Sequence, residues 1–174
     1  MKNWLLLFPV SILCLVYLQC SSPSKNDSGT TAKNKTPAPA VAAPEKGMDL
    51  SHVNVCQLIT KDDVASVFGP VRDEPKEDPP NGNEKGCTYY NQEGHFVDIS
   101  LSPLDDWNLI LQLNPDAKPI SDIGGHHAVS KPGVDSLEVW VHQDGKAVIN
   151  VRDSLQDADQ ARKFAEMAVK IVGK

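Results

Sequence analysis

The chain has few cysteines, few basic residues and, beyond its N-terminus, no long hydrophobic run, and each shortage excludes a class of protein. Its 174 residues include four Cys, which are too few for a disulfide-dense scaffold and form no Cys-x-x-Cys pair of the kind that holds zinc. Lys and Arg total 17 against 23 Asp and Glu, for a net charge of −6. Because nucleic-acid binding requires clustered positive charge, this balance argues against a nucleic-acid partner. No later run of about 18 apolar residues predicts a membrane span.

The composition that remains is that of one ordinary globular domain. Apolar residues make up 40 % of the chain and charged residues 23 %, which is neither disordered nor fibrous composition. The chain has no Gly-x-Ser-x-Gly, no phosphate-binding glycine loop and no His-Glu-x-x-His. Its one Ser-x-x-Lys, Ser22 to Lys25, lies in a polar stretch that cannot hold a fixed geometry. We therefore predict no catalytic residue, no cofactor and no metal ligand.

The N-terminus has the features of a secretory signal. Lys2 supplies a positive charge, and residues 4–18 form a 15-residue apolar run interrupted by Pro9. This run is short for a membrane span, which needs roughly 20 residues, and it suits the hydrophobic region of a signal peptide. An N-terminal anchor helix is the alternative. The polar pair Ser21-Ser22 directly after the run favours cleavage over anchoring.

Cys20 ends the apolar run and is the predicted lipid attachment site. The segment resembles a bacterial lipoprotein signal, in which the thiol of the first mature residue is diacylated. Tyr17 and Gln19 occupy positions where that signal commonly has Leu and a small residue. Cys14, the rival acceptor, would leave an apolar stub behind it. We therefore predict a signal peptide over residues 1–19 and a palmitate-bearing Cys20, which anchors the chain without a transmembrane helix.

Residues 20–47 are predicted to be a disordered membrane tether. Residues 21–47 hold four Pro and no aromatic residue, so they cannot bury enough apolar surface to offset the entropy of ordering. Four Lys against Asp27 and Glu45 give these residues a charge of +2. Residues 48–174, the predicted single domain, hold 12 basic and 21 acidic residues, for a charge of −9. An anionic membrane therefore attracts the tether and repels the head.

Cys56 and Cys87 are the cysteines that remain once the signal is removed and Cys20 is lipidated. Outside the cytoplasm such a pair most often forms a disulfide. A metal thiolate pair and a redox couple are the alternatives. Both need closely spaced sulfurs or a thiol at a helix N-terminus, and neither pattern is visible. We predict a structural bridge, which stabilises the fold by roughly 3–4 kcal/mol on the chain-entropy account.

The hydrophobic pattern of residues 48–174 predicts an α+β domain. Thr60 and Asp63 form a capping box for a first helix, which stops at Gly69. Further along we expect a hairpin around residues 92–94, a helix from 102 to 114, a short strand at 127–130, a hairpin around 143–145 and a helix from 155 to 172. The order is α-ββ-α-βββ-α. Tight hairpins make the sheet mainly antiparallel, with about five strands and the helices packed on one face.

The two hairpins set an expected register and place Trp140. Three-residue loops that end in Gly pair Cys87 with Ile99 in the first hairpin and His142 with Lys146 in the second. Trp140 then lies on the sheet face away from the apolar side chains that the terminal helix covers. A large aromatic residue there is either covered by another helix or exposed for a partner. This makes Trp140 the candidate binding face.

The remaining candidates for a site are the five histidines, namely His52, His95, His126, His127 and His142. Adjacent residues on a strand point to opposite faces, so regular strand geometry does not aim both His126 and His127 at one ion. The alternative function is nevertheless a hydrolase or a metal-dependent enzyme, with a site assembled from distant residues around these two histidines and a carboxylate such as Asp122.

Several short segments of the domain resemble one family of small bacterial lipoproteins, best represented in actinobacteria, whose shared domain has no assigned function. The matching segments are Cys56-Gln57-Leu58-Ile59-Thr60, Asp62-Asp63-Val64 with Gly69, Cys87-Thr88-Tyr89 and Gly125-His126-His127-Ala128. The resemblance covers roughly residues 55–172. It implies secretion, a lipid anchor, the Cys56–Cys87 bridge and an α+β fold, and it implies no enzyme activity.

The sequence thus predicts a non-enzymatic lipoprotein of the bacterial cell envelope that faces outside the cytoplasm. Its acidic head, on a flexible tether, is expected to bind a partner protein or a small ligand. The enzyme around His126 and His127 is the alternative, and a structural accessory subunit is a third hypothesis. The absence of a local catalytic pattern favours the binding protein, although a pattern is not required for catalysis.

Overall fold

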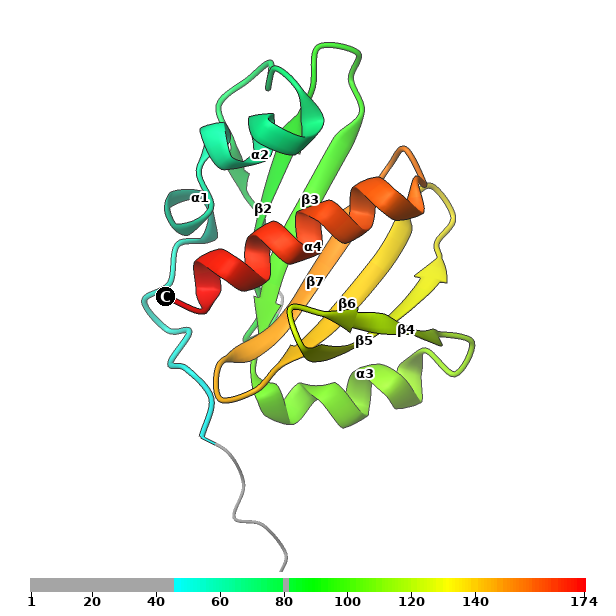
Figure 1. The fold of residues 1–174 in the computed structure, drawn as a ribbon. Coiled ribbons are helices and arrows are strands. Elements are labelled where there is room, and N and C mark those ends of the chain that lie inside the picture. Colours follow the sequence, from blue (N-terminus) through cyan, green and yellow to red (C-terminus); the bar gives the residue numbers. More distant parts are fainter. Residues whose placement is uncertain (1–45, 80–81) are drawn as a thin grey trace, which may run out of the picture. The chain divides into compact units, whose positions relative to one another are not determined.

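A computed structural model describes residues 46–79 and 82–174 (Figure 1). The predicted signal peptide, Cys20 and nearly all of the predicted tether lie outside these described residues. The described helices are α1 (Val55–Leu58), α2 (Lys61–Phe68), the 3-10 turn η1 (Leu104–Asp106), α3 (Trp107–Leu113) and α4 (Ala158–Val172). The described strands are β1 (Lys76–Glu77), β2 (Lys85–Tyr90), β3 (Phe96–Ser102), β4 (Lys118–Ile123), β5 (His126–Pro132), β6 (Leu137–Gln143) and β7 (Ala147–Asp153).

The described strands form one antiparallel sheet in the order β1-β2-β3-β7-β6-β5-β4. The fold is therefore α+β, but the prediction of about five strands and of the element order was wrong, because seven strands are present in this part of the chain. Both residues of β1 are exposed, and four of the six positions of β4 are exposed. Neither segment carries the alternation of apolar residues from which a strand is predicted. Gly124 and Gly125, both at positive φ, make the turn between β4 and β5.

The amphipathic helix α4 covers one face of the sheet (Figure 1). It begins three residues later than expected, after Asp157, whose carboxylate accepts hydrogen bonds from the backbone N–H groups of Asp159 and Gln160. Its fully buried Phe164 lies in an edge-to-face contact with Phe68 of α2, at 5.5 Å between ring centroids. The side chains beneath α4 are those that the alternation predicted, including Val139, Val141, Ile149 and Val151.

The predicted start of α2 and the predicted cysteine pair are both present. Thr60 and Asp63 form the reciprocal capping box, with the Thr60 N–H donating to Asp63 Oδ2 at 2.8 Å. Cys56 and Cys87 are joined by a disulfide, which ties α1 to β2. The alternatives of a metal thiolate pair and an open redox couple are thus not what the structure holds at these two residues.

Helix α3 lies on the opposite face of the sheet, so the prediction that all helices pack on one face was wrong. Trp140 of β6 and Val148 of β7 project from this face, which we call the α3 face. Trp107, Ile110 and Leu111 of η1–α3 pack against them in a second, smaller apolar cluster. The reason is that large apolar side chains on the α3 face need a cover of their own, which α4 on the far side cannot supply.

The register of the first hairpin is confirmed and that of the second was wrong. Cys87 lies opposite Ile99, as the three-residue loop predicted. His142 lies opposite Val148, two residues beyond its predicted partner Lys146. The second loop therefore consists of residues 144–146 rather than 143–145.

Contacts outside the hairpin explain this shift. The side-chain amide of Gln143 donates to the backbone carbonyl of Val169 in α4 at 3.0 Å, which holds Gln143 within β6. The N–H of Met48 donates to the carbonyl of Lys146 at 2.7 Å, which holds that residue in the turn. Because the shift is two residues, each side chain keeps its predicted face. Trp140 therefore still lies on the sheet face away from α4.

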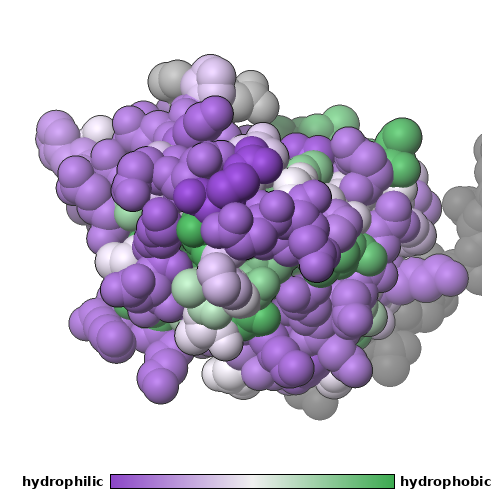
Figure 2. All heavy atoms as spheres, turned by 90° about the horizontal axis from the view of Figure 1, so that it is seen from above, coloured by the Kyte–Doolittle hydropathy of each residue, from purple (hydrophilic) through white to green (hydrophobic). Residues whose placement is uncertain are grey.

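The side of the molecule shown in Figure 2 is mainly hydrophilic, with apolar residues only in small patches. Large apolar side chains that are exposed among the described residues are Leu109, Leu113, Val134 and Leu155. Scattered single apolar residues of this kind are normal on the surface of a folded domain. Any recognition surface is therefore to be sought among polar groups.

Candidate functional site

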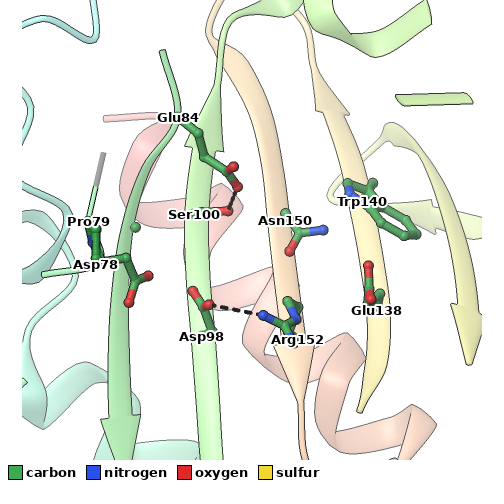
Figure 3. A pocket seen from close by; sticks show the side chains of 10 residues that line it. Asp78, Pro79, Glu84, Asp98, Ser100, Glu138, Trp140, Asn150 and Arg152 are labelled. Atoms are coloured by element: carbon green, nitrogen blue, oxygen red, sulfur yellow. Dashed lines mark hydrogen bonds and ion pairs between the residues drawn. The ribbon is translucent and has the colours of Figure 1, made fainter. Parts of the chain in front are cut away.

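A cavity of about 530 Å³ opens on the α3 face of the sheet (Figure 3). Beside α3 this face is polar, and the cavity occupies the polar part. We call it the acidic cavity. The residues that line it are Asp78, Pro79, Glu84, Gly86, Asp98, Ser100, Glu138, Trp140, Asn150 and Arg152.

The register of the central strands brings these side chains together. Asp98 on β3 lies beside Arg152 on β7, and Arg152 lies beside Glu138 on β6. In the next row, Ser100, Asn150 and Trp140 are neighbours in the same way. Along each strand, every second side chain points to the cavity. The side chains between them on β3 and β7 point to the other face and build the core under α4. Three strands therefore supply a flat floor of functional groups.

The segment before β2 supplies the acidic wall. The Oγ1 of Thr88 donates to Asp78 Oδ1 at 2.7 Å, and the Oγ of Ser100 donates to Glu84 Oε1 at 2.5 Å. Gly86 makes this arrangement possible, because a Cβ at that position would collide with the second oxygen of Asp78. A glycine in the strand thus allows a carboxylate to lie close against the sheet.

Asp98 is the most perturbed carboxyl group of the cavity. Its pKa is raised to about 7, first by burial and then by Asp78, which repels the carboxylate and hydrogen-bonds to the protonated form. Glu84 acts in the same direction, and Arg152, with Nη1 at 3.7 Å from Asp98 Oδ2, opposes them. When Asp98 is ionised, its buried Oδ1 has no donor among the described residues. A proton or another donor therefore completes this group.

Asn150 is a second sign of an incomplete site. Its side chain points into the cavity (Figure 3), and the residue is only 9 % exposed. No hydrogen bond joins its carboxamide to any other described residue. The carboxamide is therefore available to a molecule that enters the cavity.

The charges of the cavity favour a cation. Among the described residues that line it, Asp78, Glu84, Asp98 and Glu138 are acidic, and Arg152 is the single base. The Arg152 guanidinium is only loosely engaged, because its closest carboxylate oxygens lie at 3.7 and 3.9 Å. An excess of carboxylates in a recess raises the local concentration of positive ligands.

Trp140, the predicted binding residue, lines the cavity but is only 6 % exposed. Helix α3 covers most of its ring, and Lys131 Nζ lies 6.0 Å from the ring centroid. Its role in binding stays a prediction. Asp98 and Asn150 were not predicted from the sequence as site residues. The signal for them was the alternation of polar with apolar residues along β3 and β7, which marks a solvated face without showing its depth.

The structure does not bring His126 and His127 to one carboxylate. His127 Nδ1 lies 3.6 Å from Asp122 Oδ1, on a side chain that is 84 % exposed. His126 Nδ1 lies 3.7 Å from Oδ2 of a different carboxylate, that of Asp144. His142, from the facing strand, lies 3.0 Å from Asp144 Oδ1.

The other two histidines lie elsewhere. His95 is 3.4 Å from Glu93 in the first hairpin loop, and His52 lines a separate recess near α1. Across residues 46–79 and 82–174, no group of three or more His, Cys, Asp or Glu side chains is arranged to hold a metal ion. The candidate site of this part of the chain is therefore the acidic cavity rather than a histidine cluster.

No family model, curated protein or solved structure matches the chain. In the part of the chain that the structure describes, no helix is long and apolar enough to cross a membrane.

Proposed function

We propose that the protein is a non-enzymatic lipoprotein of the bacterial cell envelope whose head binds a small polar ligand in the acidic cavity. The observation that carries this proposal is the carboxamide of Asn150, which faces the cavity without a hydrogen-bond partner among the described residues, on a residue that is 9 % exposed.

The location belongs to the same proposal. A lipid on Cys20 anchors the chain, residues 20–47 form the tether, and the head faces outside the cytoplasm, as in the small bacterial lipoproteins that the domain resembles. The Cys56–Cys87 disulfide supports this location, because such bridges persist mainly in oxidising compartments.

The second hypothesis, an enzyme with a site around His126 and His127, gains no support from the contacts of these residues. They lie beside different carboxylates, and His127 is almost fully exposed. Catalytic groups need fixed positions relative to one another, which an exposed side chain lacks.

Ligand binding is tested by thermal unfolding of the full chain against a panel of small cationic, neutral and anionic molecules. Asn150→Leu replaces the carboxamide with an isopropyl group of the same branching, and Asn108→Leu makes the same change at an exposed position of α3. We expect at least one molecule to raise the unfolding midpoint of the wild type and of Asn108→Leu, but not that of Asn150→Leu. A panel in which no molecule acts, or in which every active molecule acts equally on all three proteins, would refute the proposal.

A further inference from the structure

We propose that the ligand of the acidic cavity carries a primary alkylammonium group, which binds between the carboxyl groups of Asp78 and Asp98 with its N–H donors directed at the free acceptors of the cavity. This inference rests on the proposed ligand-binding role and adds the chemical class of the ligand. The protons balance: the ammonium enters with all its protons, and the proton of Asp98 leaves to the solvent.

The polar atoms of the cavity match the donors of such a group. An ammonium presents three N–H donors and no acceptor. Asp98 Oδ1 has no donor when ionised, and Asp78 uses only its Oδ1 for the bond to Thr88. The carbonyl oxygen of Asn150 is the third free acceptor that faces the cavity. The site thus offers unoccupied acceptors where a cation with several donors is needed.

The rest of the lining favours an alkyl chain behind the charged group. Trp140 and Pro79 place apolar surface on two sides of the same cavity, and these surfaces can contact methylene groups. A divalent metal ion fits less well, because the described carboxylates are not grouped with the geometry that such an ion needs. A ligand with a guanidinium group also fits less well, because its bulkier positive group would lie beside the positive charge of Arg152.

Exchange against a proton makes the affinity depend on pH. The charged groups that face Asp98 from the neighbouring segments are Asp78, Glu84, Glu138 and Arg152, with Lys76 and Asp135 further out along the same face. Asp98, with its pKa raised to about 7, is mostly protonated near pH 6 and mostly ionised near pH 8. Binding therefore releases close to one proton per ligand near pH 6 and little near pH 8, and the affinity rises with pH between them.

The test is isothermal titration calorimetry of the full chain, purified in a non-ionic detergent, with n-butylamine as the probe. At each pH, two buffers that lack primary amines and differ in ionisation enthalpy report the number of protons released. We expect saturable binding of one butylamine, the pH-dependent proton release described above, and no binding of 1-butanol or butyltrimethylammonium, which lack the ammonium donors. Nα-Acetyl-lysine methylamide distinguishes an ammonium on a peptide from a free amine, and binding of either supports the class.

Variants show where the amine binds. Asp98→Asn and Asp78→Asn each remove one acceptor charge, and we expect each to weaken butylamine binding by roughly tenfold or more. Asp62→Asn removes the same charge at an exposed position of α2 and is expected to leave the affinity within about twofold. Thermal unfolding of each variant shows that the protein is folded, and because Asp98→Asn removes a repulsion it should unfold no earlier than the wild type.

The failure of this inference is distinguishable from the failure of the proposed function. If Ca²⁺ or acetate binds and Asn150→Leu abolishes that binding, while neither amine binds, the cavity is a ligand site and the alkylammonium class is wrong. Equal butylamine affinity in the wild type, Asp98→Asn and Asp78→Asn, or binding near pH 6 without proton release, also overturns the inference. If no probe binds to the wild type at all, the proposed function fails with it.

Discussion

Two carboxyl groups with raised pKa values distinguish this domain at the scale of single residues. Asp98 lies in the acidic cavity, where burial and Asp78 raise its pKa to about 7. Asp153 is fully buried on the other face of the sheet, and desolvation raises its pKa as well. Its Oδ1 accepts from the N–H of Leu155 at 3.0 Å, and its Oδ2 has no donor within the described ranges. Both groups make the folded state hold protons more tightly than the unfolded state.

The first prediction is that Asp98 makes the protein less stable as the pH rises from about 4 to 7. In this window the folded state keeps the proton of Asp98 and the unfolded state, with an ordinary pKa near 4, has lost it. Unfolding free energy therefore falls as the pH rises, by at most about 1.4 kcal/mol per pH unit for this one group.

Urea unfolding at several pH values checks this slope in the wild type and in Asp98→Asn. We expect a clearly smaller decline in the variant, with Asp153 responsible for part of what remains. Asp62→Asn, the charge-matched control on α2, should keep the wild-type slope. Parallel curves for Asp98→Asn and the wild type would show that Asp98 does not hold its proton in the folded state.

At the scale of elements, the approach of the 78–79 segment to β2 defines the acidic wall. The second prediction concerns Gly86, where an added Cβ would overlap the Asp78 carboxylate. We expect Gly86→Ala to cost about 1 kcal/mol in unfolding free energy and to weaken butylamine binding, because the Asp78 carboxylate must move away from the sheet.

A double-mutant cycle checks the cause of that cost. In the Asp78→Ala background the overlapping carboxylate is absent, so Gly86→Ala should be nearly neutral there. Urea unfolding of the four proteins gives the coupling free energy. A cost of Gly86→Ala that is the same in both backgrounds would mean that the glycine serves another purpose.

The third prediction is that the disulfide stabilises the head without shaping the acidic cavity. Cys87 faces the core under α4, away from the cavity. Replacing both Cys56 and Cys87 with Ser should lower the unfolding free energy by roughly 3–4 kcal/mol and leave butylamine affinity unchanged in the folded protein. Urea unfolding and calorimetry measure the two effects. An unchanged stability, or a lost affinity in a folded double variant, would contradict this division.

Helices and hairpins were predicted correctly where residues close together in the sequence specify them. The capping box at Thr60, the apolar stripe of α4 and the first hairpin are specified by residues close together in the chain, and all three were predicted. The second hairpin was misregistered because its register depends on bonds from Gln143 and Lys146 to residues distant in sequence. Such contacts leave no mark in a local pattern.

The candidate site followed the same rule. Trp140 was predicted to lie on the sheet face away from α4. This prediction held despite the wrong register, because a two-residue shift leaves the side-chain alternation of a strand unchanged. Asp98 and Asn150 looked like ordinary polar residues of a solvated face. The cavity exists because Asp78, from a polar loop, approaches a glycine of β2, and no hydrophobic pattern predicts where a polar loop lies.

At the scale of the whole molecule, the account joins an N-terminal lipid, a basic tether and an acidic head. The fourth prediction is that Cys20→Ala loses incorporated palmitate and moves from the membrane fraction to the soluble fraction, because the acyl chains are the proposed anchor. Metabolic labelling with palmitate and fractionation of the cells measure both effects. Cys14→Ala is the matched control and should behave as the wild type. Label that persists in Cys20→Ala and is lost in Cys14→Ala would place the lipid on the other cysteine.

The most direct test of the ligand-binding account is nuclear magnetic resonance of the full chain during titration with n-butylamine. The side-chain amide of Asn150 and the indole N–H of Trp140 are reporters that line the cavity from neighbouring strands. We predict that the Asn150 resonances shift to saturation, with the affinity measured by calorimetry, and that 1-butanol leaves them in place. Asn150 resonances that do not move at saturating amine, or shifts confined to residues outside the acidic cavity, would contradict the account.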